Sequence, residues 1–147
     1  MTHWSERHTV VPAVYVLLER DGKVLLLRRA HTGFSDGCYT PPAGHLNGGE
    51  APSVAMAREA MEEVGVTVKL EDLELVHCMI YMAAEGDHER VTLFFTAKHF
   101  TGEPRNMEPN KCDDVDWFSK DALPEMVWEA KHAFEQIAAG HVYSEVY

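Results

Sequence analysis

The sequence has few cysteines, little basic charge and no long hydrophobic run. Its three cysteines, Cys38, Cys78 and Cys112, lie far apart and form no CxxC pair, so we expect reduced thiols rather than a disulfide framework or a zinc site. The chain carries 13 Lys and Arg against 24 Asp and Glu, and its formal net charge of -11 argues against binding nucleic acid polymers. No apolar run approaches the ~20 residues that span a bilayer. Residues 1–8 lack the apolar stretch of a signal peptide, so we expect a cytoplasmic protein without a membrane partner.

The length of the chain limits the number of domains that it can form. With 147 residues it suits a single domain that is large enough to bury a core. Hydrophobic residues make up 46% and charged residues 25%, which is the balance of a soluble globular protein. We expect one domain over residues 1–147 that begins with a short polar tail, residues 1–8.

The first part of the chain predicts two strands followed by a long loop. Residues 10–18 are almost continuously apolar and rich in valine, as in a central strand buried on both faces. The dipeptide Asp21-Gly22 favours a tight turn, so residues 23–27 should form a hairpin with the first strand. Residues 30–50 show no periodicity and contain many glycines and prolines, which predicts a long loop of the kind that is usually functional.

A helix is predicted over residues 51–64. Pro52 is tolerated in its first turn, and Gly65 is a good C-terminal stop. Its spacing predicts a buried stripe with the glutamates near one edge. The residues of this stripe are Val54, Ala55, Ala57, Met61 and Val64.

The second half of the chain predicts three more strands and a final helix. Residues 73–83 and 90–100 are apolar segments around a polar turn at residues 85–88, and residues 115–118 suggest a short strand. Pro124 should open a helix that ends near Ala139. For this helix we expect packing by Val127, Trp128, Ala130, Phe134 and Ile137. Strands combined with two such helices predict an α/β sandwich with a mixed sheet.

Three glutamates in the first helix indicate a metal site. Glu59, Glu62 and Glu63 are spaced i, i+3 and i+4, so a helix places them on one face as neighbours. Like charges at these spacings oppose each other by a few tenths of a kcal/mol per pair. Mg²⁺ prefers carboxylate oxygens and keeps waters that a phosphate can displace. We therefore expect a hard divalent cation at this face.

The spacing around these glutamates resembles a known motif. The fixed positions are Gly44, Glu50, Arg58-Glu59-Ala60, Glu62-Glu63 and Gly65-Val66. This pattern resembles the Nudix box of the MutT/Nudix hydrolases, without a mismatch across its 23 positions from 44 to 66. The resemblance implies a Nudix fold, an α/β/α sandwich with a mixed sheet in which the box forms a loop–helix–loop.

The resemblance also implies a ligand set for the metal. Glu59 and Glu63 resemble the principal ligands, Glu62 a further or water-mediated ligand, and the carbonyl of Gly44 another. The cofactor implied is Mg²⁺, with Mn²⁺ as a substitute. Bound metal can neutralise a polyphosphate, orient it and lower the pKa of an attacking water.

Further residues of the box receive roles by the same resemblance. Glu50 and Arg58 resemble a pair that ties the loop to the helix, which is a structural salt bridge. The general base differs between Nudix enzymes. Glu59 or Glu63 is the first choice here, and Glu108 in a later loop is the reserve.

Several residues outside the carboxylate cluster are candidates for substrate contacts. Arg28 and Arg29 end the second strand. An arginine at this position can bind phosphate through two hydrogen bonds, or it can simply keep the strand end soluble. Of the two we favour Arg29. His45 lies inside the loop of the box and is a candidate for substrate contact. Trp117 and Phe118 are expected in the core.

A second segment narrows the substrate class. Residues 104–112 (PRNMEPNKC), together with 116–118 and 123–124, resemble a segment of Nudix nucleoside triphosphate diphosphatases. This similarity implies hydrolysis of a nucleoside triphosphate to monophosphate and pyrophosphate, and includes Glu108 among the substrate-binding candidates. The chain departs from common Nudix patterns at Asn47, where many members carry a glutamate, so the number of metal ions stays open.

Three other functions remain to be distinguished from triphosphate hydrolysis. The substrate can instead be a nucleoside diphosphate linked to a sugar or to a second nucleotide. A Nudix isopentenyl diphosphate isomerase would protonate a double bond, but such enzymes depart from the box. A Nudix ligand-sensing domain usually accompanies a DNA-binding domain, for which the chain has neither room nor positive charge.

Many similar proteins are homodimers, and the sequence leaves this state open.

Overall fold

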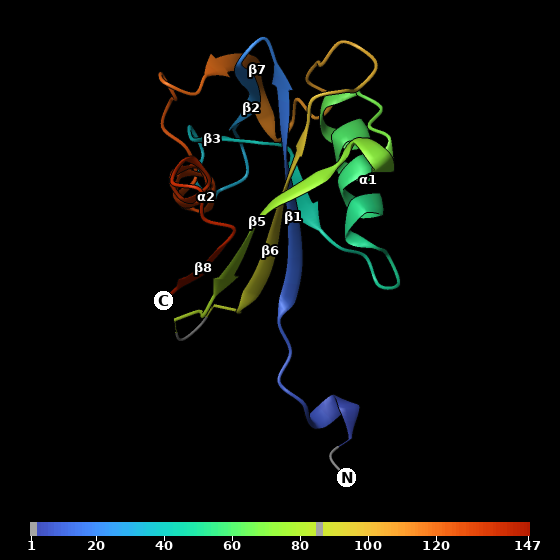
Figure 1. Cartoon of the computed structure of the whole chain (residues 1–147), viewed down its shortest axis with the longest axis vertical. Helices are drawn as coiled ribbons and strands as arrows, with labels where there is room; N and C mark the ends of the chain where they lie inside the picture. The colour runs from blue at the N-terminus through green and yellow to red at the C-terminus, as the bar shows by residue number, and fades with distance from the viewer. Residues whose placement is uncertain (1–2, 85–86) are drawn as a thin grey trace.

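A mixed β-sheet runs through the molecule between two α-helices (Figure 1). The structure is a computed structural model and describes residues 3–84 and 87–147. The elements in chain order are η1 (Trp4–Glu6), β1 (Val11–Arg20), β2 (Lys23–Arg29), β3 (Tyr39–Thr40), β4 (Ala43–His45), α1 (Pro52–Val64), η2 (Leu70–Asp72), β5 (Glu74–Tyr81), β6 (Arg90–Ala97), β7 (Cys112–Ser119), α2 (Trp128–Ala138) and β8 (Tyr143–Val146). Within the described residues, no helix has the length and hydropathy of a membrane span.

The sheet is organised around β1. The strand order is β3-β2-β1-β6-β5-β8, with β4 paired to β1 and β7 paired to β2. β1 runs parallel to β6, and β5 runs parallel to β8, whereas the other pairs are antiparallel. The predicted hairpin is confirmed, because β1 pairs with β2 across a turn in which Asp21 and Gly22 have φ values of 51° and 74°.

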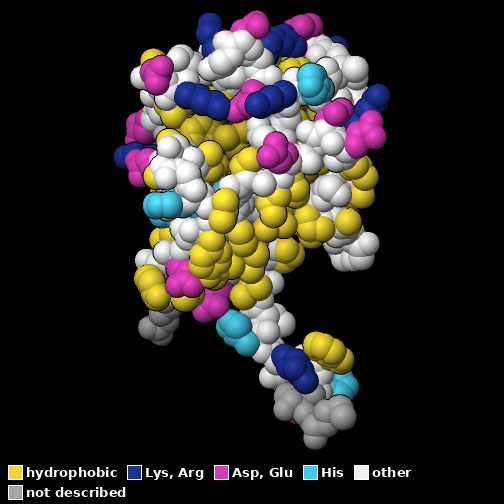
Figure 2. Space-filling model, in the orientation of Figure 1, with side chains coloured by type: hydrophobic (Ala, Val, Ile, Leu, Met, Phe, Trp, Pro, Cys, Tyr) yellow, Lys and Arg dark blue, Asp and Glu magenta, His cyan; other side chains and the backbone are white. Residues whose placement is uncertain are grey.

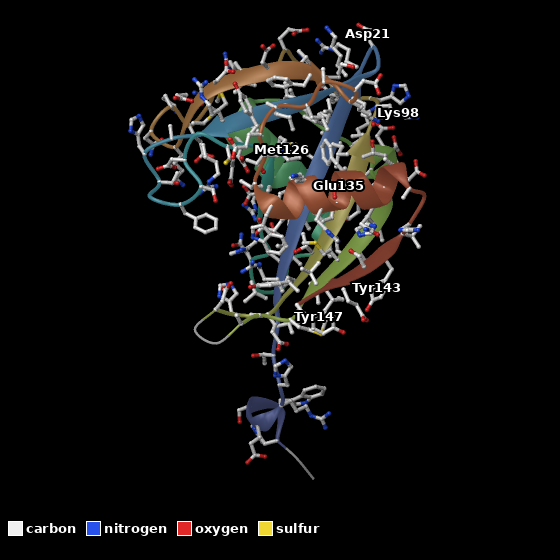
Figure 3. All side chains as sticks on the ribbon, turned by 90° about the vertical axis from the view of Figure 1, so that its left-hand side faces the viewer. Asp21, Lys98, Met126, Glu135, Tyr143 and Tyr147 are labelled. Atoms are coloured by element: carbon white, nitrogen blue, oxygen red, sulfur yellow. The ribbon has the colours of Figure 1, made fainter. Side chains whose placement is uncertain are left out.

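Each helix covers one face of the sheet with its own hydrophobic core. On one face α1 packs against alternate residues of β1, namely Val14, Val16 and Leu18. On the other face α2 packs over Leu17 of β1 and Phe94 of β6. Figure 3 shows α2 lying across this second face. The predicted α/β sandwich with a mixed sheet is thus confirmed.

The buried stripe of α1 differs from the prediction. Its buried residues are Ala55, Met56, Ala60 and Val64. Val54 and Met61, which the spacing placed in the core, are 43% and 44% exposed. The helix is rotated so that its buried side continues into Glu59 and Glu63, which face the loop of the box. The stop at Gly65 is confirmed by its left-handed φ of 73°.

The loop over residues 30–50 is more ordered than predicted. It contains the short strands β3 and β4, and β4 pairs antiparallel with β1 through Ala13–His45 and Tyr15–Ala43. This pairing fixes the first residues of the box against the centre of the sheet.

The C-terminal part differs from the prediction in three respects. α2 begins at Trp128 rather than Pro124, because Tyr39 exchanges backbone hydrogen bonds with residues 125–127 and holds them extended. Trp128, expected in the core, is 38% exposed. β8 was not predicted at all. Strands β5 and β6 match the two predicted apolar segments, while residues 85–86 of the predicted turn between them lie outside the described residues.

Candidate active site

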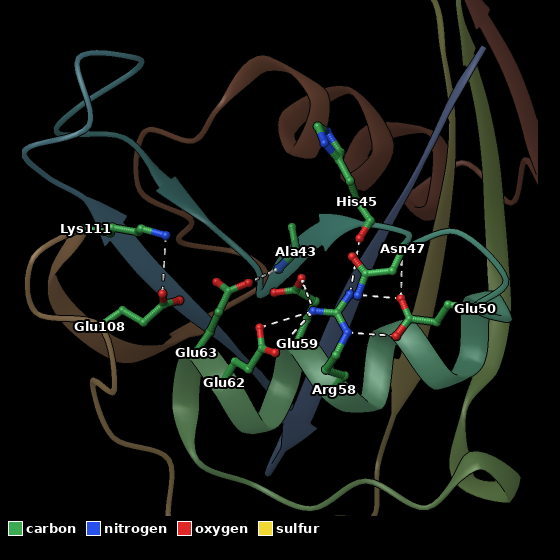
Figure 4. Close-up of polar contacts among 10 residues, drawn as sticks. All are labelled: Ala43, His45, Asn47, Glu50, Arg58, Glu59, Glu62, Glu63, Glu108 and Lys111. Carbon is green, nitrogen blue, oxygen red and sulfur yellow. Dashed lines mark hydrogen bonds and ion pairs between the residues drawn. The ribbon is translucent and has the colours of Figure 1, made fainter. Parts of the chain in front are cut away.

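Gly44 lets the box loop lie directly against α1. A Cβ atom built on Gly44 would overlap the carboxylate of Glu59, so only glycine fits at this position. The backbone N–H of the preceding residue, Ala43, donates a hydrogen bond of 3.0 Å to Oε1 of Glu63 (Figure 4). The pairing of β4 with β1 therefore holds both glutamates at the surface of the sheet.

Arg58 connects the loop to the helix and reaches three carboxylates. Its guanidinium binds Glu50 in a bidentate manner, with Nε–Oε2 at 2.8 Å and Nη2–Oε1 at 2.9 Å. Its Nη1 lies 2.8 Å from Glu59 and 3.2 Å from Glu62. The hydrogen bonds from Arg58, with one from the N–H of Asn47, lower the pKa of Glu50 to about 2. The same carboxylates raise the pKa of Arg58.

The glutamates line a cavity of about 620 Å³. Glu59, Glu62 and Glu63 contribute from α1, and Glu108 contributes from the loop before β7. The cationic residues Arg29 and Lys111 line the same cavity, and the Nζ of Lys111 lies 3.5 Å from Glu108. The cavity thus presents carboxylates and cationic side chains together, as recognition of a metal-bound polyphosphate requires.

Glu63 is the carboxylate of this cavity whose pKa is raised. Burial raises its pKa well above the usual range, and the neighbouring carboxylates of Glu59 and Glu108 raise it further, while the hydrogen bond from Ala43 acts in the opposite direction. A cation beside Glu63 would relieve this charge conflict.

The carboxylate cluster fits a divalent metal by its chemistry. All its side-chain donors are hard oxygens, which suits Mg²⁺ or Mn²⁺. Among the residues that the structure describes, no three acidic, histidine or cysteine side chains are arranged with the geometry of a metal site. In the present arrangement Arg58 engages Glu59 and Glu62. Metal binding would therefore require these side chains to reorient toward the ion.

Sequence reasoning overlooked other residues of this cavity. Lys111 belongs to the motif over residues 104–112, but no role was assigned to it. His31, Thr32 and Asn110 also line the cavity. Only Lys111 carried a signal in the sequence, because it lies three residues after Glu108.

A second hollow of about 420 Å³ adjoins the first. The two share Arg29 and Ala43 in their linings. Gly44 and His45 line the second hollow, so the structure places the His45 candidate here and not among the glutamates. Arg29 donates hydrogen bonds to the carbonyl of Phe34 at 2.8 Å and to Oγ1 of Thr32 at 3.1 Å, which fixes it between the hollows.

The inner wall of the second hollow carries a buried ion pair. Nη2 of Arg90 lies 3.3 Å from Oε1 of Glu129, and their side chains are 15% and 10% exposed. Burial raises the pKa of Glu129. Tyr15 lines the same hollow and stacks on Phe94 at 4.8 Å. Sequence reasoning had assigned no role to Arg90 or Glu129, which are 39 positions apart.

Most of the chain matches a known family. A family model described as the NUDIX domain matches residues 7–137. The chain belongs to the Nudix hydrolase family. The predicted resemblance to the MutT/Nudix hydrolases and the predicted Nudix fold are confirmed.

Relatives of this Nudix hydrolase include curated proteins and solved structures. It is 34% identical over 115 residues to the NAD-capped RNA hydrolase NudC of Chromobacterium violaceum, covering 78% of this chain and 40% of that protein. It is 30% identical over 125 residues to NudC of Escherichia coli, covering 84% and 45%. The chain therefore spans less than half the length of these relatives. A MutT NUDIX hydrolase structure from Burkholderia pseudomallei superposes with a TM-score of 0.80 and 28% identity, covering 88% of this chain and 98% of that one.

These similarities define the chemistry at a coarse level. The named relatives of this Nudix enzyme are hydrolases, which favours hydrolysis over isomerisation or ligand sensing. Nudix hydrolases generally use divalent metal ions and act on small-molecule substrates.

Proposed function

We propose that this Nudix hydrolase is a metal-dependent pyrophosphohydrolase, which cleaves a nucleoside triphosphate to monophosphate and pyrophosphate. One observation carries the proposal. Four carboxylates, those of Glu59, Glu62, Glu63 and Glu108, line one cavity together with Arg29 and Lys111. Such a lining suits a phosphoanhydride held between a bound divalent cation and positive side chains.

Different residues of the cavity are proposed to bind the metal and the phosphates. Glu59 and Glu63 are proposed as principal metal ligands, with Glu62 and the Gly44 carbonyl as further ligands. When bound, Mg²⁺ or Mn²⁺ supplies positive charge for the phosphates and acidifies a water molecule. Arg29 donates N–H groups toward the phosphate oxygens.

A carboxylate must accept the proton of the attacking water. Glu59 or Glu63 is the first candidate for this base. Glu108 is the reserve, because it lines the same cavity from the opposite loop and its partner Lys111 lies 3.5 Å away. Glu50 and Arg58 are proposed to act structurally, since their bidentate ion pair joins the loop to the helix.

The adjoining hollow is proposed to receive the nucleoside. It opens beside the phosphate cavity across Arg29 and Ala43, so a nucleotide can extend from one hollow into the other. His45 and Tyr15 line this hollow, and the Arg90–Glu129 pair offers hydrogen-bonding groups there.

A substituted nucleoside diphosphate is the second candidate substrate. The similarity to NudC proteins, which are named NAD-capped RNA hydrolases, favours a phosphoanhydride between two nucleotide moieties. The two candidates share the same bond chemistry and differ in the group that leaves.

A substrate panel separates the two candidates. Purified protein would be incubated with eight nucleoside triphosphates, NAD and nucleotide sugars, each with Mg²⁺ and with Mn²⁺, and the products separated by chromatography. Pyrophosphate from triphosphates supports the leading proposal, whereas two monophosphates from NAD support the second. No metal-dependent turnover of any substrate would contradict both.

We further propose that the chain acts as one Nudix domain on a small nucleotide in the cytoplasm, as a homodimer. The net charge of -11 opposes binding of nucleic acid polymers. Cys38, Cys78 and Cys112 are free thiols, in keeping with a reducing compartment.

A further inference from the structure

The buried ion pair of Arg90 and Glu129 faces a cavity, which is the second hollow. Arg90 begins β6, Glu129 lies in the first turn of α2, and both residues line the hollow. Replacing a buried ion pair by well-packed hydrophobic residues is often neutral or even stabilising, because burial removes both charges from water. Stability alone therefore does not account for this ion pair, and its position at a cavity points to a ligand.

Three contacts fix the guanidinium of Arg90. Its Nη1 lies 3.4 Å from Oδ1 of Asp87, and its Nη2 lies 3.3 Å from Oε1 of Glu129. Its Cζ lies 4.7 Å from the centre of the Tyr81 ring. Charge-assisted hydrogen bonds are usually about 2.7–2.9 Å long. Because both contacts of Arg90 are longer, its N–H groups can also donate to a ligand in the hollow.

The carboxylate of Glu129 keeps one oxygen for a ligand. Among the described residues, Arg90 is the one side chain that donates a hydrogen bond to it, and this bond ends on Oε1. The backbone N–H of Glu129 itself favours the ionised form, as does the N-terminus of α2. The second oxygen, Oε2, can therefore accept hydrogen bonds from a molecule in the hollow.

Arg90 and Glu129 together present one donor followed by two acceptors. The donor is Nη2 of Arg90, the middle acceptor is Oε1 of Glu129, and the outer acceptor is Oε2. A complementary base must offer an acceptor, a donor and a second donor in that order. Guanine does so with its O6, its N1–H and its N2 amino group.

The other bases match this order less well. Adenine and cytosine place an amino group opposite the N–H of Arg90, so that two donors meet. Uracil and thymine match the first two positions with O4 and N3–H, but their O2 would face Oε2 of Glu129. Hypoxanthine also matches these two positions and lacks the amino group that reaches Oε2. Polar groups left unpaired in a buried site cost affinity, so the ion pair can discriminate between bases.

Aromatic side chains line the hollow beside the ion pair. Phe34 is 59% exposed there, and a base stacks readily on such a ring. His45 lines the same hollow and points away from the carboxylate cluster (Figure 4). Arg29 lines both hollows, and its guanidinium lies 5.6 Å from the centre of the Phe34 ring. A base held here directs its phosphates past Arg29 toward the carboxylate cavity.

The outer surface offers a nucleotide less selectivity than the hollow does. Figure 2 shows Lys and Arg side chains interspersed with Asp and Glu at the upper end of one face, above an area of hydrophobic side chains. A surface of mixed charge on a chain with a net charge of -11 attracts anions only weakly. Selection among nucleotides therefore falls to the groups that contact the base.

We propose that the second hollow selects guanine, and that Arg90 and Glu129 recognise its Watson–Crick edge. The substrate is then a guanine nucleotide, either a triphosphate or a guanosine diphosphate linked to another group. The inference rests on the proposed function only in placing a nucleoside in this hollow. It requires neither the metal nor the hydrolytic step.

Isothermal titration calorimetry of the full chain with nucleoside monophosphates tests the selection. The titrations contain EDTA, and they are run at pH 8.5 because burial raises the pKa of Glu129. IMP differs from GMP only in lacking the N2 amino group. We expect GMP to bind at least fivefold more tightly than IMP, and at least tenfold more tightly than AMP or CMP.

Glu129→Gln should reverse the preference between GMP and IMP. Arg90 has only donors, so the amide oxygen faces it and the amide NH₂ group takes the place of Oε2. This NH₂ group then meets the N2 amino group of GMP but no donor of IMP. We expect at least a tenfold loss of GMP affinity and a smaller change for IMP. Glu135→Gln is the matched control, because Glu135 lies on the same helix and is exposed (Figure 3).

Three results would overturn the selection of guanine. They are equal affinity of the wild type for GMP and IMP, a Glu129→Gln protein with a native circular dichroism spectrum that still prefers GMP, and no binding of any monophosphate at 5 mM. Hydrolysis is measured separately. Turnover of all nucleoside triphosphates at similar rates would overturn this inference and leave the proposed reaction intact, whereas selective binding of GMP without any turnover would do the reverse.

Discussion

At the scale of single residues, the site depends on close contact between a glycine and a glutamate. Gly44 has no side chain, and the carboxylate of Glu59 occupies the space that a Cβ would need. The same strand donates the Ala43 N–H to Glu63. The two glutamates proposed as principal metal ligands are thus positioned by the backbone of three residues of β4.

Gly44→Ala should therefore displace Glu59. We expect at least a tenfold loss of kcat/KM and a cost of about 1–3 kcal/mol in the free energy of unfolding, as for an overpacked site. Gly48→Ala is the matched control, because Gly48 lies in the same loop and a Cβ there meets no atom within 4 Å. Equal activity of the two variants in a steady-state assay would show that the contact is unimportant.

Glu108→Ala tests the loop opposite α1. Loss of a carboxylate that lines the cavity should slow turnover or raise KM, and we expect kcat/KM to fall at least fivefold. Glu103→Ala provides the control, since Glu103 is 82% exposed and pairs with Arg20 away from the cavity. Unchanged kinetics of Glu108→Ala would limit Glu108 to a structural role.

The candidate site was only partly predictable at this scale. Glu59 and Glu63 follow from helical spacing, because i and i+4 positions share a face. The Arg90–Glu129 pair joins β6 to α2 and leaves no local pattern. Only tertiary packing brings such residues together.

At the scale of elements, the orientation of α1 is set by the site as well as by the core. The exposed Val54 and Met61 fit a hydrophobic stripe by spacing, yet the buried positions are small alanines with Met56 and Val64. Small side chains let the helix approach β4 closely enough for Glu59 and Glu63 to meet its backbone.

Other elements were missed for different physical reasons. β8 has only four residues of mixed polarity, and its parallel pairing with β5 joins distant parts of the chain. The first turn predicted for α2 is extended, because residues 125–127 bond to Tyr39. The hairpin of β1 and β2 was predictable, since Asp21-Gly22 encodes its turn locally.

The ion pair between Glu50 and Arg58 predicts that the free energy of unfolding depends on pH. The pKa of Glu50 is about 2 in the folded protein, below the usual value of 4.5 for an unfolded chain. The ionised Glu50 therefore stabilises the folded protein above pH 4.5, and this contribution is lost as the pH falls toward 2. We expect Glu50→Gln to unfold at lower urea than the wild type at pH 7, and the difference to shrink at pH 3. The exposed pair Arg20–Glu103 serves as comparison, and Glu103→Gln should change little at either pH.

At the scale of the whole molecule, the hydrophobic residues that stabilise the fold lie apart from the charged residues of the candidate active site. The two hydrophobic cores lie on opposite faces of the sheet and consist of apolar residues of the strands and helices. The carboxylate cavity and the adjoining hollow lie beside β4, where they share Arg29 and Ala43.

Removal of metal should consequently stop turnover without unfolding the protein. We expect treatment with EDTA to abolish hydrolysis while the far-UV circular dichroism spectrum stays unchanged, and added Mg²⁺ or Mn²⁺ to restore activity. Turnover that persists in excess EDTA would contradict a metal-dependent mechanism.

The most direct test of the account compares wild type with Glu63→Gln in Mg²⁺-dependent product release from nucleoside triphosphates. Glu63 is a half-buried carboxylate that accepts a hydrogen bond from Ala43 and is close enough to Glu59 and Glu108 for their charges to raise its pKa. Glutamine keeps its shape while removing its charge. We predict monophosphate and pyrophosphate from the wild type and near-complete loss of both products from a folded Glu63→Gln protein. Near-normal activity of that variant would contradict the central claim that these carboxylates bind the catalytic metal.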